Sequence, residues 1–268
     1  MKIPENTFKR ALLAGQQQYG FWLGLCHPLS AELCAHTGYD WLLIDGEHAP
    51  NDLNTVLSQL QAIAATPAHP VVRLVEGNTA LIKQYLDAGV QSLLIPMVES
   101  ADQARELVKA VQYPPQGVRG VGTALARAAR WNMVEDYFKS VDDEILLIVQ
   151  IESVTGLENL AEILAVDGVD AVFIGPADLA ASMGHLGNPA HPEVKAAVES
   201  AIRQIRAAGK PAGTLATNKT LAKHYESVGI QFMALGVDTL ALATAAKNTL
   251  ANHLAEDMPS VSEGNGAY

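Results

Sequence analysis

Two acidic residues occupy positions where this chain could hold a metal ion. Glu152 closes the apolar segment VQIE, and Asp178 follows the segment FIGPA. Carboxylate oxygens are the ligands that Mg²⁺ and Mn²⁺ prefer, and two of them leave positions open for water and a bidentate 2-oxo acid. We therefore predict that Glu152 and Asp178 bind a divalent metal. The alternative is that each is an ordinary carboxylate at a helix N-terminus.

A second group of polar residues could stabilise charge and move a proton. Arg73 closes the apolar segment PVVRL, where a guanidinium could stabilise an oxyanion or a carboxylate. The alternative is a structural ion pair with Glu47 or Glu99. Asp45 and His48 lie on one turn, and if Asp45 accepts from one imidazole nitrogen, the other is free to act as a base. In the alternative, His48 caps the next helix, and Glu47 could take either role.

The segments that must position these residues alternate between short apolar runs and longer amphipathic stretches. The apolar runs are rich in Val, Ile and Leu and are nearly continuous, which is typical of strands buried on both faces of a parallel sheet. The predicted strands are Phe21–Leu25, Trp41–Asp45, Val71–Leu74, Ser92–Val98, Ile145–Ile151, Ala171–Gly175, Ala212–Ala216 and Phe232–Gly236.

The amphipathic stretches predict helices between the strands. They are Asp52–Ala65, Asn78–Ala88, Ala101–Val111, Thr155–Leu164, His191–Ala208, Asn218–Val228 and Thr239–Leu254, and an extra helix at Asn6–Ala14 should cover the bottom of the fold. Eight strands, each followed by a helix, predict an α/β chain of the (β/α)8 TIM barrel type. The carboxyl ends of its strands would bring the polar residues above to one mouth.

The predicted barrel domain spans residues 1–255, and a polar tail with Pro and Gly, residues 256–268, is expected to be disordered. A long connection, Tyr113–Asp143, precedes the fifth strand, and connections of that size are usually functional. Trp22, in the first strand, is a candidate substrate contact near the mouth, with a core position as the alternative.

Composition excludes several classes of function. The 268 residues are 49% hydrophobic and carry a formal net charge of −11, which argues against nucleic-acid binding. The chain has no apolar run long enough to cross a membrane and no secretory signal, so we expect a cytoplasmic location. No lysine stands at a strand end, where a Schiff-base aldolase of this fold would carry one. That absence favours metal-dependent chemistry.

Several long motifs carry a family resemblance. They are WLLIDGEHAPND, PVVRL, KQYLDAG, LLIPMV, YPPQGVRGVG, ARAARWN, VQIE and VDGVDAVFIGPADLAASMG. From about Phe8 to Leu254 the chain resembles the metal-dependent, class II aldolases of 2-oxo acids. That family includes 4-hydroxy-2-oxoheptanedioate aldolase and 2-dehydro-3-deoxyglucarate aldolase, and the former is the closer match.

The resemblance implies a barrel of the phosphoenolpyruvate/pyruvate type, with Mg²⁺, Mn²⁺ or Co²⁺ bound by Glu152 and Asp178. It implies that Arg73 steadies the pyruvate enolate and that Asp45 and His48 work as a pair. It also implies a homo-oligomer, usually a hexamer, in which subunits exchange the eighth helix of the barrel. The pyruvate pocket of the family corresponds to Gln150, Gly175, Pro176 and Ala177.

The implied reaction cleaves 4-hydroxy-2-oxoheptanedioate, or a related 4-hydroxy-2-oxo acid, to pyruvate and an aldehyde such as succinate semialdehyde, in aromatic-compound catabolism. Three alternatives stay open. A 2-dehydro-3-deoxyglucarate aldolase would use the same site. A citramalyl-CoA-type lyase would need a basic groove for the CoA phosphates, which the composition of this acidic chain does not indicate. The third is a non-catalytic assembly subunit, against which the complete set of Asp, His, Arg and Glu side chains argues.

Overall fold

The computed structural model describes residues 1–256, which form a closed barrel of eight parallel strands in sequence order. The strands are β1 (Gln18–Leu23), β2 (Trp41–Asp45), β3 (His69–Arg73), β4 (Ser92–Ile95), β5 (Leu146–Ile151), β6 (Ala171–Ile174), β7 (Ala212–Leu215) and β8 (Phe232–Val237). The prediction of a (β/α)8 barrel with these eight strands is confirmed. β2 has the predicted bounds, and the other strands shift by a few residues at their ends.

The strand register decides which side chains meet at the mouth. Every neighbouring pair is parallel, so all eight carboxyl ends lie at one end of the barrel. Asp45 pairs directly with Arg73 across β2 and β3. The strand ends alone therefore bring residues that lie far apart in the chain to one end of the barrel.

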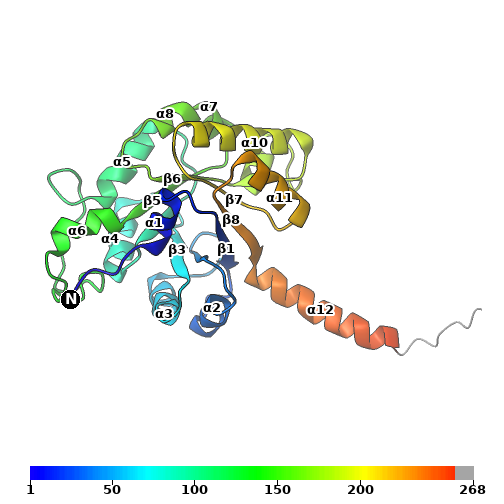
Figure 1. The fold of residues 1–268 in the computed structure, drawn as a ribbon, viewed down its shortest axis with the longest axis horizontal. Coiled ribbons are helices and arrows are strands. Elements are labelled where there is room, and N and C mark those ends of the chain that lie inside the picture. The colour runs from blue at the N-terminus through cyan, green and yellow to red at the C-terminus, as the bar shows by residue number, and fades with distance from the viewer. Residues whose placement is uncertain (257–268) are drawn as a thin grey trace, which may run out of the picture.

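Helices surround the barrel (Figure 1). They are α1 (Thr7–Leu13), α2 (Pro28–Ala35), α3 (Leu53–Ile63), α4 (Thr79–Ala88), α5 (Ala101–Val111), α6 (Tyr137–Glu144), α7 (Val154–Glu158), α8 (Leu160–Leu164), α9 (Pro176–Ser182), α10 (Pro192–Ala207), α11 (Lys219–Val228) and α12 (Asp238–Glu256). The helices α2, α6 and α9 were not predicted from the sequence. The stretch predicted as one helix, Thr155–Leu164, is divided into α7 and α8 at Asn159, which ends one helix and begins the next.

Local capping explains where several helices begin and end. Asp52 accepts from the backbone of Thr55 in a capping box that starts α3. Gly89 and Gly229 adopt left-handed conformations, with φ of 99° and 106°, and end α4 and α11. This conformation is favourable for glycine and satisfies the last carbonyls of a helix.

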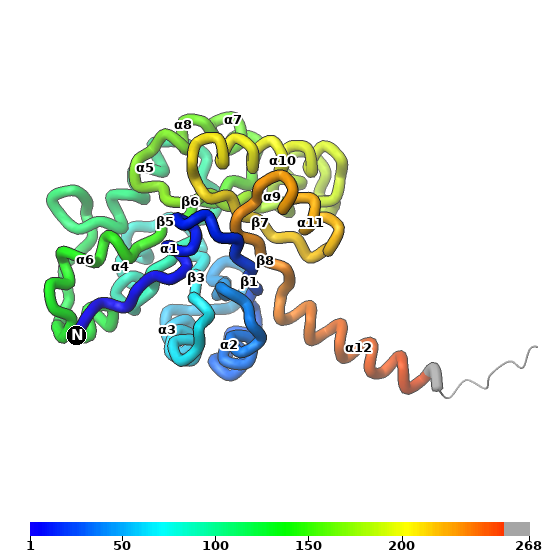
Figure 2. Tube along the Cα trace, viewed as in Figure 1, coloured from blue at the N-terminus to red at the C-terminus, as the bar shows by residue number. Residues whose placement is uncertain are grey.

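The inside of the barrel is a packed core that α1 closes from the amino ends of the strands. Phe8 of α1 is buried, and its ring centroid lies 5.5 Å from Trp41 and 5.7 Å from Phe232, at the starts of β2 and β8. The expected extra helix at the bottom of the barrel is therefore present. The first residues of the chain, blue in Figure 2, run beside the connection that contains α6, where the Met1 amino group donates to Met133 O at 2.8 Å.

The last helix leaves the barrel rather than packing on it (Figure 1). All side chains from Thr239 to Leu254 are exposed, including Leu240, Leu242 and Leu250. The helix is anchored at its first residue, because the carboxylate of Asp238 accepts from the backbone of Gly24 at 2.8 Å and of Leu25 at 3.1 Å. A long helix without packing partners is marginally stable in water, so this apolar surface calls for a partner.

Within residues 1–256, no helix is both long enough and apolar enough to cross a membrane. The predicted tail, residues 256–268, lies outside the described residues from 257 onward.

Candidate active site

A buried ion pair between Asp45 and Arg73 forms one half of the mouth. Arg73 Nε donates to Asp45 Oδ1 at 2.9 Å and Nη2 donates to Oδ2 at 2.6 Å, which gives a bidentate contact. The two residues are only 4% and 6% exposed. Burial alone would raise the pKa of Asp45, but the hydrogen bonds and charge of Arg73 hold it below its ordinary value. Asp45 is therefore a carboxylate that fixes the orientation of the guanidinium.

Trp22 completes this half of the site. Its indole Nε1 donates to Asp45 Oδ2 at 3.1 Å, and its ring lies 5.0 Å from the guanidinium carbon of Arg73. Trp22 is 7% exposed and also packs against Phe173, with ring centroids 5.7 Å apart. The residue thus belongs to the barrel core and to the site at once. Its direct contact with a substrate stays a prediction.

The expectation that Asp45 orients the imidazole of His48 is wrong for this structure. Both oxygens of Asp45 are taken by Arg73, and His48 reaches Asp45 only through its backbone N–H, at 3.4 Å. The guanidinium wins because it is a permanent cation whose planar fork matches a carboxylate. The His48 side chain is 65% exposed, and its Nε2 lies 3.9 Å from Glu47 Oε2. Glu47, not Asp45, is the carboxylate beside the imidazole.

Glu47 also contacts the free end of the guanidinium. Its Oε2 lies 2.9 Å from Arg73 Nη1, so the expected alternative of an Arg73–Glu47 ion pair is observed together with the Asp45 pair. The angle does not make this contact a hydrogen bond, and Oε2 has no hydrogen-bond partner among the described residues. Burial raises the pKa of Glu47. The positive charge of Arg73 and the nearby His48 lower it, and the negative charges of Asp45 and Asp178 raise it. Glu47 is thus held less tightly than Asp45.

Glu152 forms the other half of the mouth. It is 2% exposed, its Oε1 accepts from the backbone of Met97 at 2.9 Å, and its Oε2 accepts from the side-chain amide of Gln150. Met97 adopts a left-handed conformation with φ of 53°, which the residue type does not predict. Gly175 leaves room for the carboxylate, because a Cβ there would lie 2.3 Å from Glu152 Oε2. These contacts fix the side chain in one orientation.

Asp178 reaches the mouth from the first turn of α9. Pro176 and Ala177 precede it, with Pro176 half-buried and both Ala177 and Asp178 exposed. Burial raises the pKa of Glu152, and the negative charges of Glu47 and Asp178 raise it further. Glu47, Glu152 and Asp178 follow the carboxyl ends of β2, β5 and β6, so the fold places all three at the same end of the barrel.

This donor set fits a divalent cation. The carboxylates supply hard oxygen ligands, and a cation between them would relieve their mutual repulsion. Gln150 Oε1 is buried without a hydrogen-bond partner among the described residues. Buried polar atoms are normally satisfied, so this oxygen is available to accept a hydrogen bond from a water or another bound molecule.

Comparison with known proteins gives a consistent result. Residues 18–245 match the family described as HpcH/HpaI aldolase/citrate lyase. The chain is 56% identical over 268 residues to a hydroxypyruvate/pyruvate aldolase from Pseudomonas aeruginosa, with all of both chains covered. It is 58% identical over 243 residues to a 4-hydroxy-2-oxo-heptane-1,7-dioate aldolase from Escherichia coli, covering 91% of this chain and 93% of that one.

A solved structure shows the same fold. The crystal structure of an HpcH/HpaI aldolase/citrate lyase family protein from Burkholderia cenocepacia J2315 superposes with a TM-score of 0.89. It is 40% identical in sequence, and the match covers 92% of this chain and 98% of that chain. The barrel and its order of strands are therefore shared with relatives across nearly the full length.

The buried ion pair predicts a pH-dependent effect of one substitution. Arg73→Met leaves Asp45 and Glu47 without their cation, so we expect a loss of about 3–5 kcal/mol in the free energy of unfolding at neutral pH. Burial is the largest influence on the pKa of Asp45, and without Arg73 only the hydrogen bonds from Glu47 N and Trp22 Nε1 oppose it, so we expect this pKa to rise above its ordinary value. The folded variant then binds more protons than the unfolded chain, so its stability rises as the pH falls.

Urea unfolding at about pH 7.5 and about pH 5.5 measures this effect. The difference between wild type and Arg73→Met should be smaller at the lower pH. The matched control is Arg203→Met, which removes an exposed partner of Glu199 and should change stability by less than about 0.5 kcal/mol at either pH. An equal loss at both pH values for Arg73→Met would contradict the assignment of a charged, buried pair.

Proposed function

The chain belongs to the HpcH/HpaI aldolase/citrate lyase family, and we propose that it is a divalent-metal-dependent aldolase that releases pyruvate from 4-hydroxy-2-oxo acids. It is an enzyme of the lyase class, as its aldolase relatives are named. The observation that carries the proposal is that Glu47, Glu152 and Asp178 lie at the same end of the barrel as the fixed guanidinium of Arg73, which Glu47 contacts directly. It offers a cation site and an oxyanion site at one mouth.

We propose that Glu152 and Asp178 hold the metal. Glu152 is oriented in advance by Met97 and Gln150, so little ordering remains when an ion binds. When bound, a divalent cation supplies Lewis acidity to the carbonyl of the 2-oxo acid. Gln150, with its unsatisfied oxygen, and the backbone from Gly175 to Ala177 would line the pyruvate end of the substrate.

The role of Arg73 follows from which of its nitrogens is free. Nε and Nη2 are held by Asp45, so the Nη1 end is the part that faces Glu47 and the open mouth. As the bond between C3 and C4 breaks, its electron pair passes to C3 and delocalises onto the 2-oxo oxygen. A guanidinium held in position stabilises that oxyanion without having to reorganise. Asp45 and Trp22 act by positioning Arg73.

We propose His48 as the base that takes the proton from the 4-hydroxyl group. The imidazole is exposed at the mouth, and Glu47 lies beside it, so Glu47 can stabilise the protonated ring. Loss of the hydroxyl proton lets the C4 oxygen become the aldehyde carbonyl while the enolate of pyruvate leaves. Protonation of the enolate at C3 then gives pyruvate, and the proton on His48 is available for this step.

The substrate class follows from the named relatives and stays a proposal for this chain. One group is named for 4-hydroxy-2-oxo-heptane-1,7-dioate and another for hydroxypyruvate and pyruvate. Cleavage of the first compound would give pyruvate and succinate semialdehyde. Hydroxypyruvate differs from pyruvate by one hydroxyl group at C3, so both could enter the same oxyanion and metal site.

The proposed metal ligands can be tested by substitution. Glu152→Gln and Asp178→Asn should each lower the cleavage of 4-hydroxy-2-oxoheptanedioate by at least about 10³-fold, because each removes a charged ligand of a Lewis acid. Pyruvate release with and without chelator measures activity, and calorimetric titration with Mg²⁺ or Mn²⁺ measures binding. Asp102→Asn, at an exposed ion pair on α5, is the matched control. Full activity of thoroughly chelated protein would refute the proposal.

Two reactions distinguish the role of the base from that of the enolate site. His48→Ala should lower aldol cleavage by about 10²–10⁴-fold, as expected for the loss of a general base. It should spare decarboxylation of oxaloacetate, which also passes through the pyruvate enolate but has no hydroxyl proton to remove. Asp45→Asn should impair both reactions, because it releases Arg73.

Glu47→Gln distinguishes the two carboxylates. If Glu47 supports the protonated imidazole, this variant should impair cleavage more than decarboxylation, in the same sense as His48→Ala. Equal losses of both reactions in His48→Ala, with metal still bound, would show that the imidazole shapes the site rather than taking the proton.

We also propose that the chain forms a homo-oligomer, a hexamer in the family that it resembles, through α12. A groove lined by Phe21, Leu235 and Leu240 lies where α12 leaves the barrel, and α2 exposes Leu29 and Leu33. In a barrel of this type the last helix normally covers such apolar surface. Because α12 of this chain points away, α12 of a second copy is the occupant that fits. A cytoplasmic location stays a prediction.

Substitutions on α12 test this assembly. The double substitution Leu242→Glu with Leu250→Glu should lower the molar mass found by light scattering at micromolar concentration, because it places charge on the apolar surface of α12. Lys139→Glu, at an exposed position on α6 away from α12, is the control and should leave the mass unchanged. A monomeric wild-type chain would refute the proposal.

A further inference from the structure

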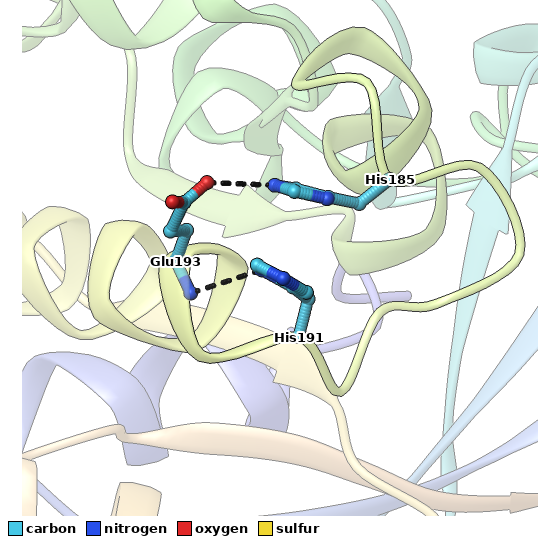
Figure 3. Close-up of side chains that lie close together, drawn as sticks. All are labelled: His185, His191 and Glu193. Carbon is cyan, nitrogen blue, oxygen red and sulfur yellow. Dashed lines mark hydrogen bonds and ion pairs between the residues drawn. The ribbon is translucent and has the colours of Figure 1, made fainter.

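We infer a second metal site, away from the barrel mouth, formed by His185, His191 and Glu193 (Figure 3). Their ligand atoms all lie within 4.8 Å of one another. The two histidines lie in the connection between α9 and α10, and Glu193 lies in the first turn of α10. The site shares no residue with the one proposed at Glu152 and Asp178, so either can fail without the other.

The three side chains are held together by contacts with one another. His185 Nε2 lies 2.7 Å from Glu193 Oε2, and the rings of His185 and His191 stack with centroids 3.6 Å apart. The backbone N–H of Glu193 donates to His191 Nδ1 at 3.3 Å and caps α10 (Figure 3). One contact network therefore links all three.

The backbone of the connection holds the two histidines side by side. His185 N donates to Ala180 O at 2.7 Å, Asn188 N donates to His185 O at 2.9 Å, and His191 N donates to Asn188 O at 3.0 Å. Gly184 and Gly187 take left-handed conformations, with φ of 83° and 76°, that allow this tight path. The loop thus orders the imidazoles before any ligand binds, which reduces the entropy lost on binding.

The donor set selects a different class of metal from that at the mouth. Two imidazole nitrogens and one carboxylate oxygen suit Zn²⁺, Co²⁺ or Ni²⁺, whereas Mg²⁺ prefers ligands that are all oxygen. An ion bound by these three side chains would keep one or more positions for water. The side chain of His185 is 23% exposed and that of Glu193 is 69% exposed, so an ion can enter from solvent.

Binding requires a small rearrangement that the chemistry permits. The stacked rings, with planes 16° apart, keep their lone pairs in separate and nearly parallel planes, so at least one imidazole must turn before both can face one ion. The torsion involved is broad in histidine. Ligand atoms on one ion lie about 3–4 Å apart for bonds of about 2.0–2.1 Å, so the shifts needed are short. If Nε2 of His191 binds the ion, Nδ1 takes the proton and the helix cap is given up.

The chain carries its own comparator for an ordinary His–Glu ion pair. His224 Nε2 lies 3.1 Å from Glu199 Oε2, on an exposed surface between α11 and α10. This pair offers two side chains where the cluster on the α9–α10 connection offers three. If surface ion pairs of this kind were enough to bind the metal, both places would respond alike.

Calorimetric titration with Zn²⁺ in excess Mg²⁺ tests the site, because the Mg²⁺ competes for the oxygen ligands at the mouth. We expect one zinc ion per chain that excess Mg²⁺ does not displace. Three variants each remove one ligand: His191→Asn keeps a helix-capping side chain, His185→Phe keeps a stacking ring, and Glu193→Gln keeps the shape. Each should weaken zinc binding by at least about tenfold. His224→Asn is the control and should leave binding unchanged.

Thermal unfolding and the absorption of Co²⁺ give readouts that do not depend on activity. In excess Mg²⁺, Zn²⁺ should raise the Tm of the wild type and not that of His191→Asn, while the Tm of this variant without Zn²⁺ should match the wild type. Substituting Co²⁺ should give visible bands that weaken in His191→Asn and Glu193→Gln. Unchanged zinc affinity in these two variants, an equal loss in His224→Asn, or displacement of the zinc by Mg²⁺ would each overturn the proposal.

Discussion

The bidentate ion pair between Asp45 and Arg73 is the interaction on which the rest of the site depends. Its charges are buried, so each residue would be unstable in the fold without the other. Asp45 and Arg73 are directly paired across β2 and β3, so the register of these two strands determines how the guanidinium is oriented. One edge of Arg73 is thereby fixed, and the other is left for Glu47 or for an oxyanion. Trp22 adds a hydrogen bond and a ring contact to the same pair.

At the same end of the barrel as this cation lie three carboxylates, Glu47, Glu152 and Asp178, and only Glu47 contacts Arg73. Glu152 is buried and held by Met97 and Gln150, and its pKa is raised by burial and by the nearby charges of Glu47 and Asp178. Such an arrangement is unfavourable unless a cation joins it. In the proposed function, Arg73 would be the permanent cation of the mouth, and Glu152 and Asp178 would hold an exchangeable one. An enolate forming between the two would be stabilised by both.

Two features outside the mouth show how the barrel is extended. α12 carries apolar residues into solvent, and only contact with another surface would make that arrangement favourable. The connection after α9 gathers His185, His191 and Glu193 through backbone hydrogen bonds of its own. Each feature is built on the frame of the barrel without altering the residues at the mouth.

The sequence by itself determined the barrel, because eight short apolar runs with helical periods between them leave few other ways to bury that surface. It also placed Asp45, Arg73, Glu152 and Asp178 at strand ends, since that depends only on where each run stops. The division of Thr155–Leu164 at Asn159 and the helices α2, α6 and α9 were missed, because these helices are short and their patterns weak. Helix periodicity is hard to detect over one or two turns.

Only the tertiary structure decided which side chains pair at the mouth. Asp45 and His48 are close in sequence, which favoured a contact between them, but a guanidinium from the next strand competes better for both carboxylate oxygens. The left-handed backbone at Met97 and the space left by Gly175 are likewise set by neighbouring strands. The direction of α12 could not be read from its composition, because an apolar helix packs equally well on its own barrel or on another. Pairings of this kind depend on strand register and on competition between partners, and neither is written in the spacing of residues along the chain.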